Sequence, residues 1–286
     1  MHESLADGPG LDLVREHTVY ACVVGSRAFG LAQEGGATER RGVFAAPAPL
    51  FWRLDKPPAH VAGPLEDQFS WELERFCALA LRGSPEVLEC LHSPLVEYAD
   101  EIGRELLELR GSFLSLRAVE SLRGYAHQRS ARLETALREH GEPRWNHAVH
   151  LVRLLLSCRD LVRTGRLVVE VGEERERLLA VRRGELPWGR VRSWARSLEG
   201  EIDEAAGRTP LPAEPDRTAV EDFLVRVRAR SAPAAPARRA EVPGGDGSVR
   251  PGPASEGAGR PPDWVVAGSW GAPADADRTP QGTRSR

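Results

Sequence analysis

The feature that most constrains the fold is a short apolar run that stops abruptly at a glycine and a serine. The run from Val19 to Val24 is β-branched and aromatic and has the length of a buried strand. Gly25 and Ser26 follow it directly, and glycine lets a backbone turn sharply and approach a ligand closely. A strand, a Gly-Ser turn and a turn of helix place amides and a hydroxyl around one point, which is a geometry that binds phosphate. The alternative is an ordinary turn at the end of a strand.

The residues that follow the turn resemble the signature of a known family. The two parts of the motif are Gly25-Ser26-Arg27-Ala28-Phe29-Gly30-Leu31-Ala32 and Arg41-Gly42-Val43-Phe44. They resemble the predicted nucleotidyltransferases of the DNA polymerase beta superfamily, and most closely the branch named for an RNA repair pathway. Segments 76–91, 144–155 and 178–185 resemble the family as well, so the resemblance covers roughly residues 15–216.

The metal-binding part of the motif departs from the family. The resemblance implies two metal-binding aspartates, which fall on Ala37 and Glu39. A strand directs residues i and i+2 to the same face, so two carboxylates at this spacing can hold a Mg²⁺ ion that bridges nucleotide phosphates. Glu39 keeps a carboxylate and Ala37 has none. We therefore expect Mg²⁺, or Mn²⁺, to be held weakly or not at all.

A third metal-binding carboxylate is expected on a strand over residues 67–71. The resemblance favours Asp67, because the family has an aspartate a few residues ahead of the segment that corresponds to Glu72 and the residues after it. Glu66 is a further competitor, as is Glu72 itself. Glu39 and Asp67 are therefore the candidate catalytic and metal-binding residues. The alternative for Asp67 is a solvated acid at the end of a strand.

Two arginines flank the Gly-Ser turn and are candidates for contact with a nucleotide. The planar fork of an arginine suits a phosphate group. We expect Arg27 to hold a triphosphate, together with Gly25 and Ser26. Arg41 is expected to form a structural ion pair with Glu39 or Asp67, next to the same site.

A set of polar residues recurs every three positions in a segment with helical periodicity. A helix places His147, His150 and Arg153 on one face. The resemblance implies that this face points to the nucleotide cleft, which makes His150 and Arg153 candidate nucleotide-binding residues. Two histidines at this spacing also suit a metal ion, but no third ligand accompanies them. The alternative is that these residues satisfy buried hydrogen bonds between helices.

The order of the apolar patterns predicts an α/β (α+β) fold. A small mixed nucleotidyltransferase sheet is expected within residues 1–98, followed by a helical domain over residues 99–230, with its longest helices over 113–138 and 145–164. Residues 47–64 contain five prolines and are expected to form a loop. In this loop, Trp52 is expected to pack back on the core with its neighbour or, alternatively, to stack on a base.

The C-terminal segment has a different composition from the rest of the chain. Residues 231–286 are rich in proline, alanine and glycine and lack periodicity. Such a segment cannot bury enough apolar surface to offset its conformational entropy, so we expect it to be disordered. Residues 263–270 form its one apolar island, which is either a short docking motif or a chance cluster.

The remaining features exclude several classes of protein. A net charge of −3 does not indicate a nucleic-acid coat or a membrane-surface protein. No apolar run reaches the roughly 18 residues of a membrane span, and residues 1–10 lack the apolar core of a signal peptide. The four cysteines lack the spacing of zinc ligands. We therefore expect a cytoplasmic protein with buried free thiols.

The resemblance implies a specific activity. It is the transfer of a nucleoside monophosphate from a nucleoside triphosphate to a hydroxyl acceptor, such as an RNA end. Because Ala37 removes a metal ligand, we expect this activity to be weak. The alternative is a catalytically inactive member of the family that binds a nucleotide or an RNA end.

Overall fold

The computed structural model describes residues 9–63 and 67–233. Its five-stranded sheet has the order β3-β4-β2-β1-β5. The strands are β1 (Thr18–Val23), β2 (Arg40–Phe44), β3 (His60–Ala62), β4 (Gln68–Glu72) and β5 (Val96–Ala99). Because β2 and β4 run parallel and the other neighbours run antiparallel, the predicted mixed sheet is confirmed. Most of the predicted tail, and Glu66, lie outside the described residues.

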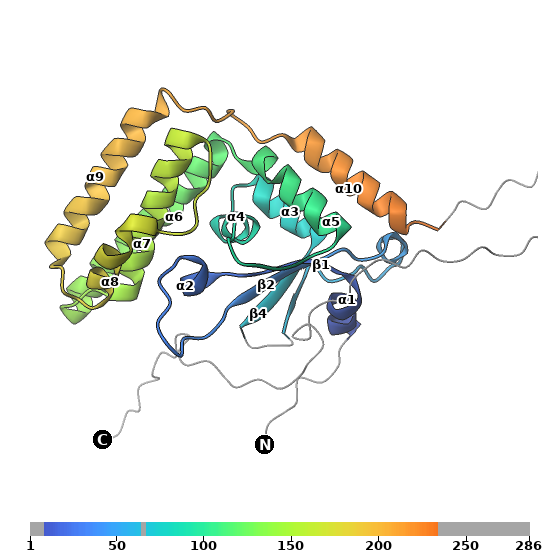
Figure 1. Cartoon of the computed structure of the whole chain (residues 1–286), viewed down its shortest axis with the longest axis horizontal. Helices are drawn as coiled ribbons and strands as arrows, with labels where there is room; N and C mark the ends of the chain where they lie inside the picture. Colours follow the sequence, from blue (N-terminus) through green and yellow to red (C-terminus); the bar gives the residue numbers. More distant parts are fainter. Residues whose placement is uncertain (1–8, 64–66, 234–286) are drawn as a thin grey trace, which may run out of the picture.

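The helices form two groups around this sheet. The α-helices are α1 (Pro9–His17), α2 (Gly25–Ala28), α3 (Leu73–Leu81), α4 (Pro85–Leu91), α5 (Glu101–Glu108), α6 (Leu116–His140), α7 (Trp145–Thr164), α8 (Arg175–Arg182), α9 (Trp188–Ala206) and α10 (Arg217–Ser231). Short 3-10 helices are η1 (Ala48–Trp52), η2 (Leu109–Phe113) and η3 (Gly172–Glu174). Helices α6 to α9 stand together beside the end of the sheet that carries α2, whereas α10 lies across α3 and α5 (Figure 1).

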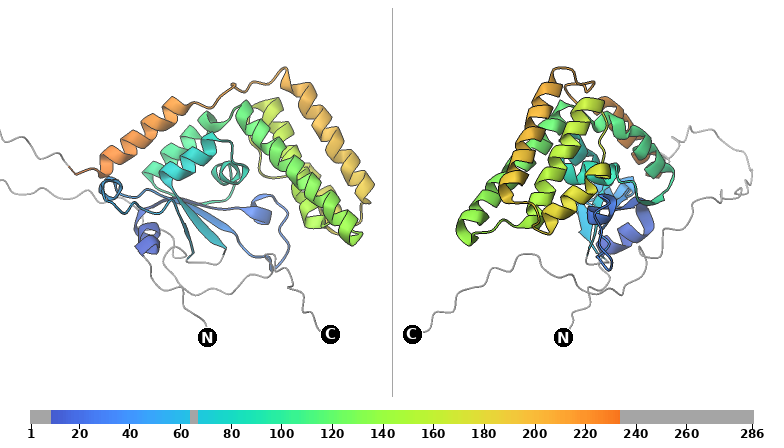
Figure 2. Two further views of the ribbon diagram at one scale, coloured as in Figure 1. Left: turned by 180° about the vertical axis from the view of Figure 1, so that it is seen from behind. Right: turned by 60° about the vertical axis from the view of Figure 1, so that its left-hand side comes forward.

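One large buried cluster joins the sheet to both groups of helices. Residues that alternate along the strands, such as Tyr20, Val43 and Trp71, pack on one face of the sheet against α3 and α4. The same cluster continues through α6, α7 and α9, and Figure 2 shows these helices standing together beside the sheet. The division of the chain at residue 98 stays a prediction. All four cysteines are buried and free, as predicted.

Helix α7 is the central helix of the group beside the sheet. It packs against both α6 and α9, so it has apolar residues on two of its sides. Leu151, Leu155 and Cys158 recur at helical spacing and are fully or almost fully buried. The helix ends at Gly165, whose φ of 71° gives a left-handed cap that suits glycine. The predicted helix over 145–164 therefore has the predicted bounds.

Several elements differ from the sequence-based expectation. The predicted loop over 47–64 contains η1 and the strand β3, which pairs with β4 at an edge of the sheet. Strand β5 and helix α10 were not predicted from the sequence. Strands of three or four residues are too short to show a clear alternation, which explains why β3 and β5 leave little signal.

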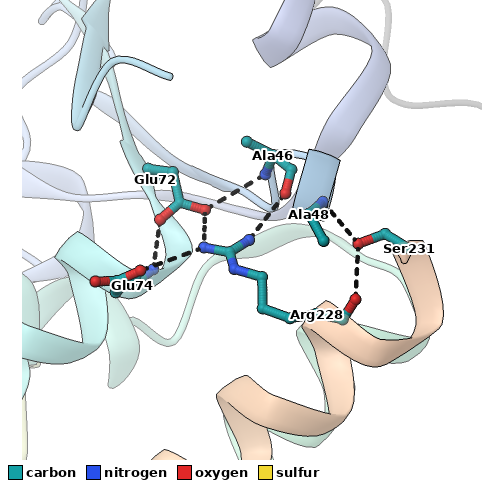
Figure 3. Close-up of polar contacts among 6 residues, drawn as sticks. All are labelled: Ala46, Ala48, Glu72, Glu74, Arg228 and Ser231. Atoms are coloured by element: carbon teal, nitrogen blue, oxygen red, sulfur yellow. Dashed lines mark hydrogen bonds and ion pairs between the residues drawn. The ribbon is translucent and has the colours of Figure 1, made fainter. Parts of the chain in front are cut away.

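Helix α10 returns to the sheet and is fastened there by Arg228 (Figure 3). The Arg228 Nη2 atom lies 2.7 Å from Oε1 of Glu72, and Nη1 donates a hydrogen bond of 2.8 Å to the Ala46 carbonyl. The guanidinium also lies 3.9 Å from the centre of the Phe51 ring. These contacts of Arg228, which we call the Arg228 clamp, join the end of the helix to β4 and to the segment after β2.

Glu72 is the acidic centre of this clamp. Its side chain is only 4% exposed, and its Oε2 accepts a hydrogen bond of 2.7 Å from the Glu74 amide, which caps α3. Near the end of α10, the Ala48 amide donates a hydrogen bond of 3.1 Å to the Ser231 hydroxyl. Glu72, a competitor for the third metal ligand, is therefore engaged in an internal ion pair.

Candidate functional site

A pocket of about 480 Å³ opens between α2 and the start of β2 on one side and α4, α6 and α7 on the other. Most of its lining residues are charged or polar. These side chains are Ser26, Glu39, Arg41, Glu86, Glu89, Tyr125, Arg129, Asn146, His150, Arg153 and Arg182. The pocket brings together six of the predicted site residues, namely Gly25, Ser26, Glu39, Arg41, His150 and Arg153. Two other predicted residues, Arg27 and Asp67, do not line it.

The glycine at the turn is required for two physical reasons. Gly25 begins α2 with a φ of 67°, a left-handed conformation that is unfavourable for other residues. A Cβ atom at this position would also overlap with the carboxylate of Glu39. The Glu39 carboxylate therefore lies close to Gly25, and Ser26 lines the same pocket.

The segment with the two family aspartate positions is not part of a strand. Strand β2 begins at Arg40, so Ala37 and Glu39 precede it, and the expectation that a strand directs both to one face is wrong. The reason lies in the two glycines before them, since Gly35 has a φ of 76° and glycine weakens a strand. The pairing of β2 with β4 begins at Arg40 and Gln68. Glu39 and Asp67 therefore lie side by side, just ahead of the first pair.

The acidic residues of the site do not make a complete metal centre. Within residues 9–63 and 67–233, no three His, Cys, Asp or Glu side chains lie where they could share a metal ion. Glu39 lines the pocket and Asp67 does not. The resemblance implies three carboxylate ligands, and Ala37 has no oxygen to contribute. The donor set therefore does not fit the metal site that the superfamily uses.

Arg41 is held by several acceptors at once. Its guanidinium lies 3.4 Å from Glu86 and 3.9 Å from Glu39. It also donates a hydrogen bond of 3.1 Å to the main-chain carbonyl of Asp67. Both predicted partners are therefore present, although Asp67 contributes its carbonyl oxygen and not its carboxylate. These contacts hold Arg41 at the wall of the pocket, beside the start of β2.

Arg153 connects three elements at the base of the pocket. Its side chain is 1% exposed, and Nη1 lies 2.8 Å from Oε1 of Glu89 on α4. Its guanidinium also lies over the Phe29 ring, 3.7 Å from the ring centre. The buried Nε atom has no hydrogen-bond partner among the residues that the structure describes. Arg153 therefore lines the pocket, as predicted, and also forms the buried contact between helices that was the alternative. Its Nε atom remains as a free hydrogen-bond donor.

His150 supports Arg153 from the previous turn of α7. The Arg153 Nη2 atom lies 3.1 Å from Nδ1 of His150. Burial, followed by the charges of Arg153 and Arg129, lowers the pKa of His150 to about 3. The imidazole is therefore neutral at pH 7, and its Nδ1 accepts the hydrogen bond from Arg153. His147, the other histidine of the pattern, does not line the pocket.

Arg27 lies outside the pocket. Its side chain is exposed, and it donates a hydrogen bond of 2.8 Å to the carbonyl of Gly36. It therefore braces the loop ahead of β2, next to Ala37. Arg182 of α8 makes a similar contact from inside the pocket, because its Nη1 donates a hydrogen bond of 2.7 Å to the Leu31 carbonyl.

Helix α6 contributes two residues to the pocket lining that the sequence analysis did not propose as site residues. Tyr125 and Arg129 are four residues apart and share one face of the helix, toward the pocket. Arg129 forms no hydrogen bond or ion pair with any described residue. Burial lowers its pKa, and the charges of Arg132 and Arg153 lower it further. A guanidinium with no acidic partner in this pocket is available to bind an anion. The four-residue spacing was the available signal in the sequence.

A comparison with protein-family models identifies the family. The model described as the RNA repair pathway DNA polymerase beta family matches residues 12–226, a span that contains every residue of the pocket lining. The chain belongs to this family. The resemblance of the segment from Gly25 to Phe44 is therefore confirmed, and with it the nucleotidyltransferase superfamily. The match begins in α1 and ends within α10, so it includes the whole sheet.

No curated protein and no solved structure matched the chain. In the part of the chain that the structure describes, each helix is too short or too polar to cross a lipid bilayer.

Proposed function

We propose that this protein binds a nucleoside triphosphate in the pocket between α2 and α6, with Ser26 and Arg129 on the phosphates. The observation that carries this proposal is the cation of Arg129, which has no partner among the described residues and lines the same pocket as the Gly25–Ser26 turn. Arg153 supports it, because its buried Nε is a free donor at the base of the pocket. A bound phosphate would satisfy both groups.

The base has a candidate partner in the same pocket. Tyr125 lines it one helical turn before Arg129, and its side chain is 48% exposed. Stacking of a base on an aromatic side chain contributes about 1–3 kcal/mol and tolerates any base. We therefore assign Tyr125 to the base and Arg129 to the phosphates. Arg27 of α2 then supports the neighbouring loop, since it contacts Gly36 and does not line the pocket.

We further propose that the transfer of a nucleoside monophosphate to a hydroxyl acceptor, such as an RNA end, is slow or absent. Phosphoryl transfer depends on cations that neutralise the developing charge on the phosphates. Glu39 and the neighbouring Asp67 are the candidate ligands for Mg²⁺ or Mn²⁺, and two carboxylates would hold such an ion weakly. The protein is then mainly a nucleotide- or RNA-end-binding member of its family.

Calorimetry with ATP and GTP tests this proposal, in Mg²⁺ and in EDTA. We expect nucleotide to bind in EDTA, and Arg129→Ala to weaken binding by about 1–3 kcal/mol, the scale of a charge-assisted hydrogen bond. The matched control is Arg138→Ala, because Arg138 lies on the same helix, is exposed and does not line the pocket. Binding that EDTA abolishes would show that Glu39 and Asp67 form a working metal site. No binding under any condition would remove the proposal.

The transfer reaction needs its own measurement. Labelled nucleoside triphosphates are incubated with an RNA that carries a free 3′ hydroxyl, in Mg²⁺ and in Mn²⁺. We expect little or no labelled RNA. Rapid formation of labelled RNA that Glu39→Gln abolishes would contradict the proposal of slow or absent transfer and show that the pocket is a working active site. The proposal of nucleotide binding would still stand.

A further inference from the structure

An apolar groove lies at the end of the sheet away from the nucleotide pocket. It holds about 990 Å³ between α1, η1 and the segment that leads into β3. Its apolar lining residues are Leu13, Leu50, Trp52, Leu54, Pro57, Pro58 and Val61. Trp52 is 67% exposed and Leu54 is 100% exposed. Large apolar side chains that gather exposed in one groove mark an interaction site. The nucleotide pocket uses none of them.

The chain leaves helix α10 directly beside this groove. Ser231, at the end of the helix, accepts a hydrogen bond from the Ala48 amide of η1. A smaller hollow of about 360 Å³ at this point is lined by Trp52 and by Ala229 and Ala232. Because Trp52 lines both the hollow and the groove, the two are neighbours. Figures 1 and 2 show the end of α10 against the loop that contains η1.

We propose that residues 263–270 of the same chain dock in this groove, with Trp264 and Trp270 on its apolar floor. The chain continues from residue 234 to residue 286, and this segment contains its one apolar island. The two tryptophans lie six positions apart, an even interval, so an extended peptide presents both on one side. Asp263 precedes them, and the groove lining has two basic residues, Arg53 and Lys56, against one acidic residue, Asp55.

The length of the connection fits this docking. The connecting segment, residues 234–263, has 30 residues, and a random coil of that length spans roughly 30 Å on average. The groove begins beside Trp52, where α10 ends, so the connection is long enough. A tether of this kind gives an effective concentration in the millimolar range. A modest affinity between the island and the groove is therefore sufficient for occupancy.

Disulfide trapping in the full chain tests the proposal. Leu54→Cys places a thiol in the groove, since Leu54 is fully exposed, and Ser269→Cys places its partner in the island. The matched control pairs Leu54→Cys with Ser255→Cys, which lies in the connecting segment. The native cysteines are buried. We expect an intramolecular disulfide at least about tenfold faster with residue 269 than with residue 255, because docking raises the local concentration.

A second variant separates docking from simple proximity. Adding Trp264→Ala and Trp270→Ala to the Ser269→Cys protein should lower its trapping rate to that of the control, and should raise amide hydrogen exchange in residues 48–62. Equal rates for residues 269 and 255, or a rate that the tryptophan changes leave unaltered, would overturn the proposal. A disulfide that joins two chains and depends on protein concentration would also overturn it, since the tail of a second copy would then fill the groove.

Discussion

Replacement of Arg228 by alanine tests whether helix α10 is an integral part of the fold. The change would remove the ion pair of 2.7 Å with Glu72, the hydrogen bond to the Ala46 carbonyl and the contact with the Phe51 ring. The Glu72 carboxylate would remain buried, since its side chain is 4% exposed. Removal of one partner of a buried ion pair costs about 3–5 kcal/mol.

The expected cost of Arg228→Ala lies at the lower end of that range. Glu72 would keep its hydrogen bond from the Glu74 amide, at 2.7 Å, and the Arg228 side chain is already 20% exposed. Loss of the contact with Phe51 would add about 0.5–1 kcal/mol. We therefore expect the free energy of unfolding to fall by about 3 kcal/mol.

Urea denaturation of the full chain measures this effect, with Arg226→Ala as the matched control. Arg226 lies on the same helix, is 57% exposed and approaches Glu105 only to 3.9 Å, and an exposed pair of this kind contributes less than about 1 kcal/mol. Adding Glu72→Gln to Arg228→Ala should recover part of the loss, because it removes the unpaired buried charge. The reasoning would be refuted by a cost for Arg228→Ala no larger than that for Arg226→Ala.

Three further changes test the site and the core. Ala37→Asp should strengthen Mg²⁺-dependent nucleotide binding, and an unchanged affinity in a Mg²⁺ titration would show that residue 37 does not face the site. Gly25→Ala should lower the free energy of unfolding by about 1–2 kcal/mol, because its φ of 67° is left-handed, and should weaken nucleotide binding because the strained turn displaces the neighbouring Ser26; urea titration and calorimetry that both match wild type would contradict this. Burial, and secondarily Arg110, lowers the pKa of His92 from 6.5 to about 4, so the unfolded state takes up a proton at a higher pH than the folded state does. Stability should therefore fall as the pH drops from 6.5 toward 4, by about 1–2 kcal/mol at pH 5, and His92→Gln should flatten this dependence in urea titrations at several pH values.

The local chemistry of the chain was readable from the sequence alone. The apolar run from Val19 and the glycine after it predict a strand and a turn, and the structure has β1 and α2 there. The 145–164 helix is bounded by its own periodicity and by Gly165. The family was also predictable from the sequence, because its motif lies within one short segment from Gly25 to Phe44. The family match over residues 12–226 confirms that prediction. Signals of this kind depend on neighbours in the chain, so they survive without knowledge of the fold.

The composition of the pocket was decided only by the tertiary structure. Arg27 adjoins the Gly-Ser turn in sequence, yet its side chain points to Gly36, whereas Arg129 comes from a helix about a hundred residues later and lines the pocket. Glu72 competed with Asp67 as a predicted metal ligand, but in the fold it pairs with Arg228, 156 positions away. A side chain's direction and its distant partner are set by how helices and strands pack, and no local pattern of residues encodes that packing. The sequence therefore predicted the turn and the family, whereas the fold determined which charges surround the pocket.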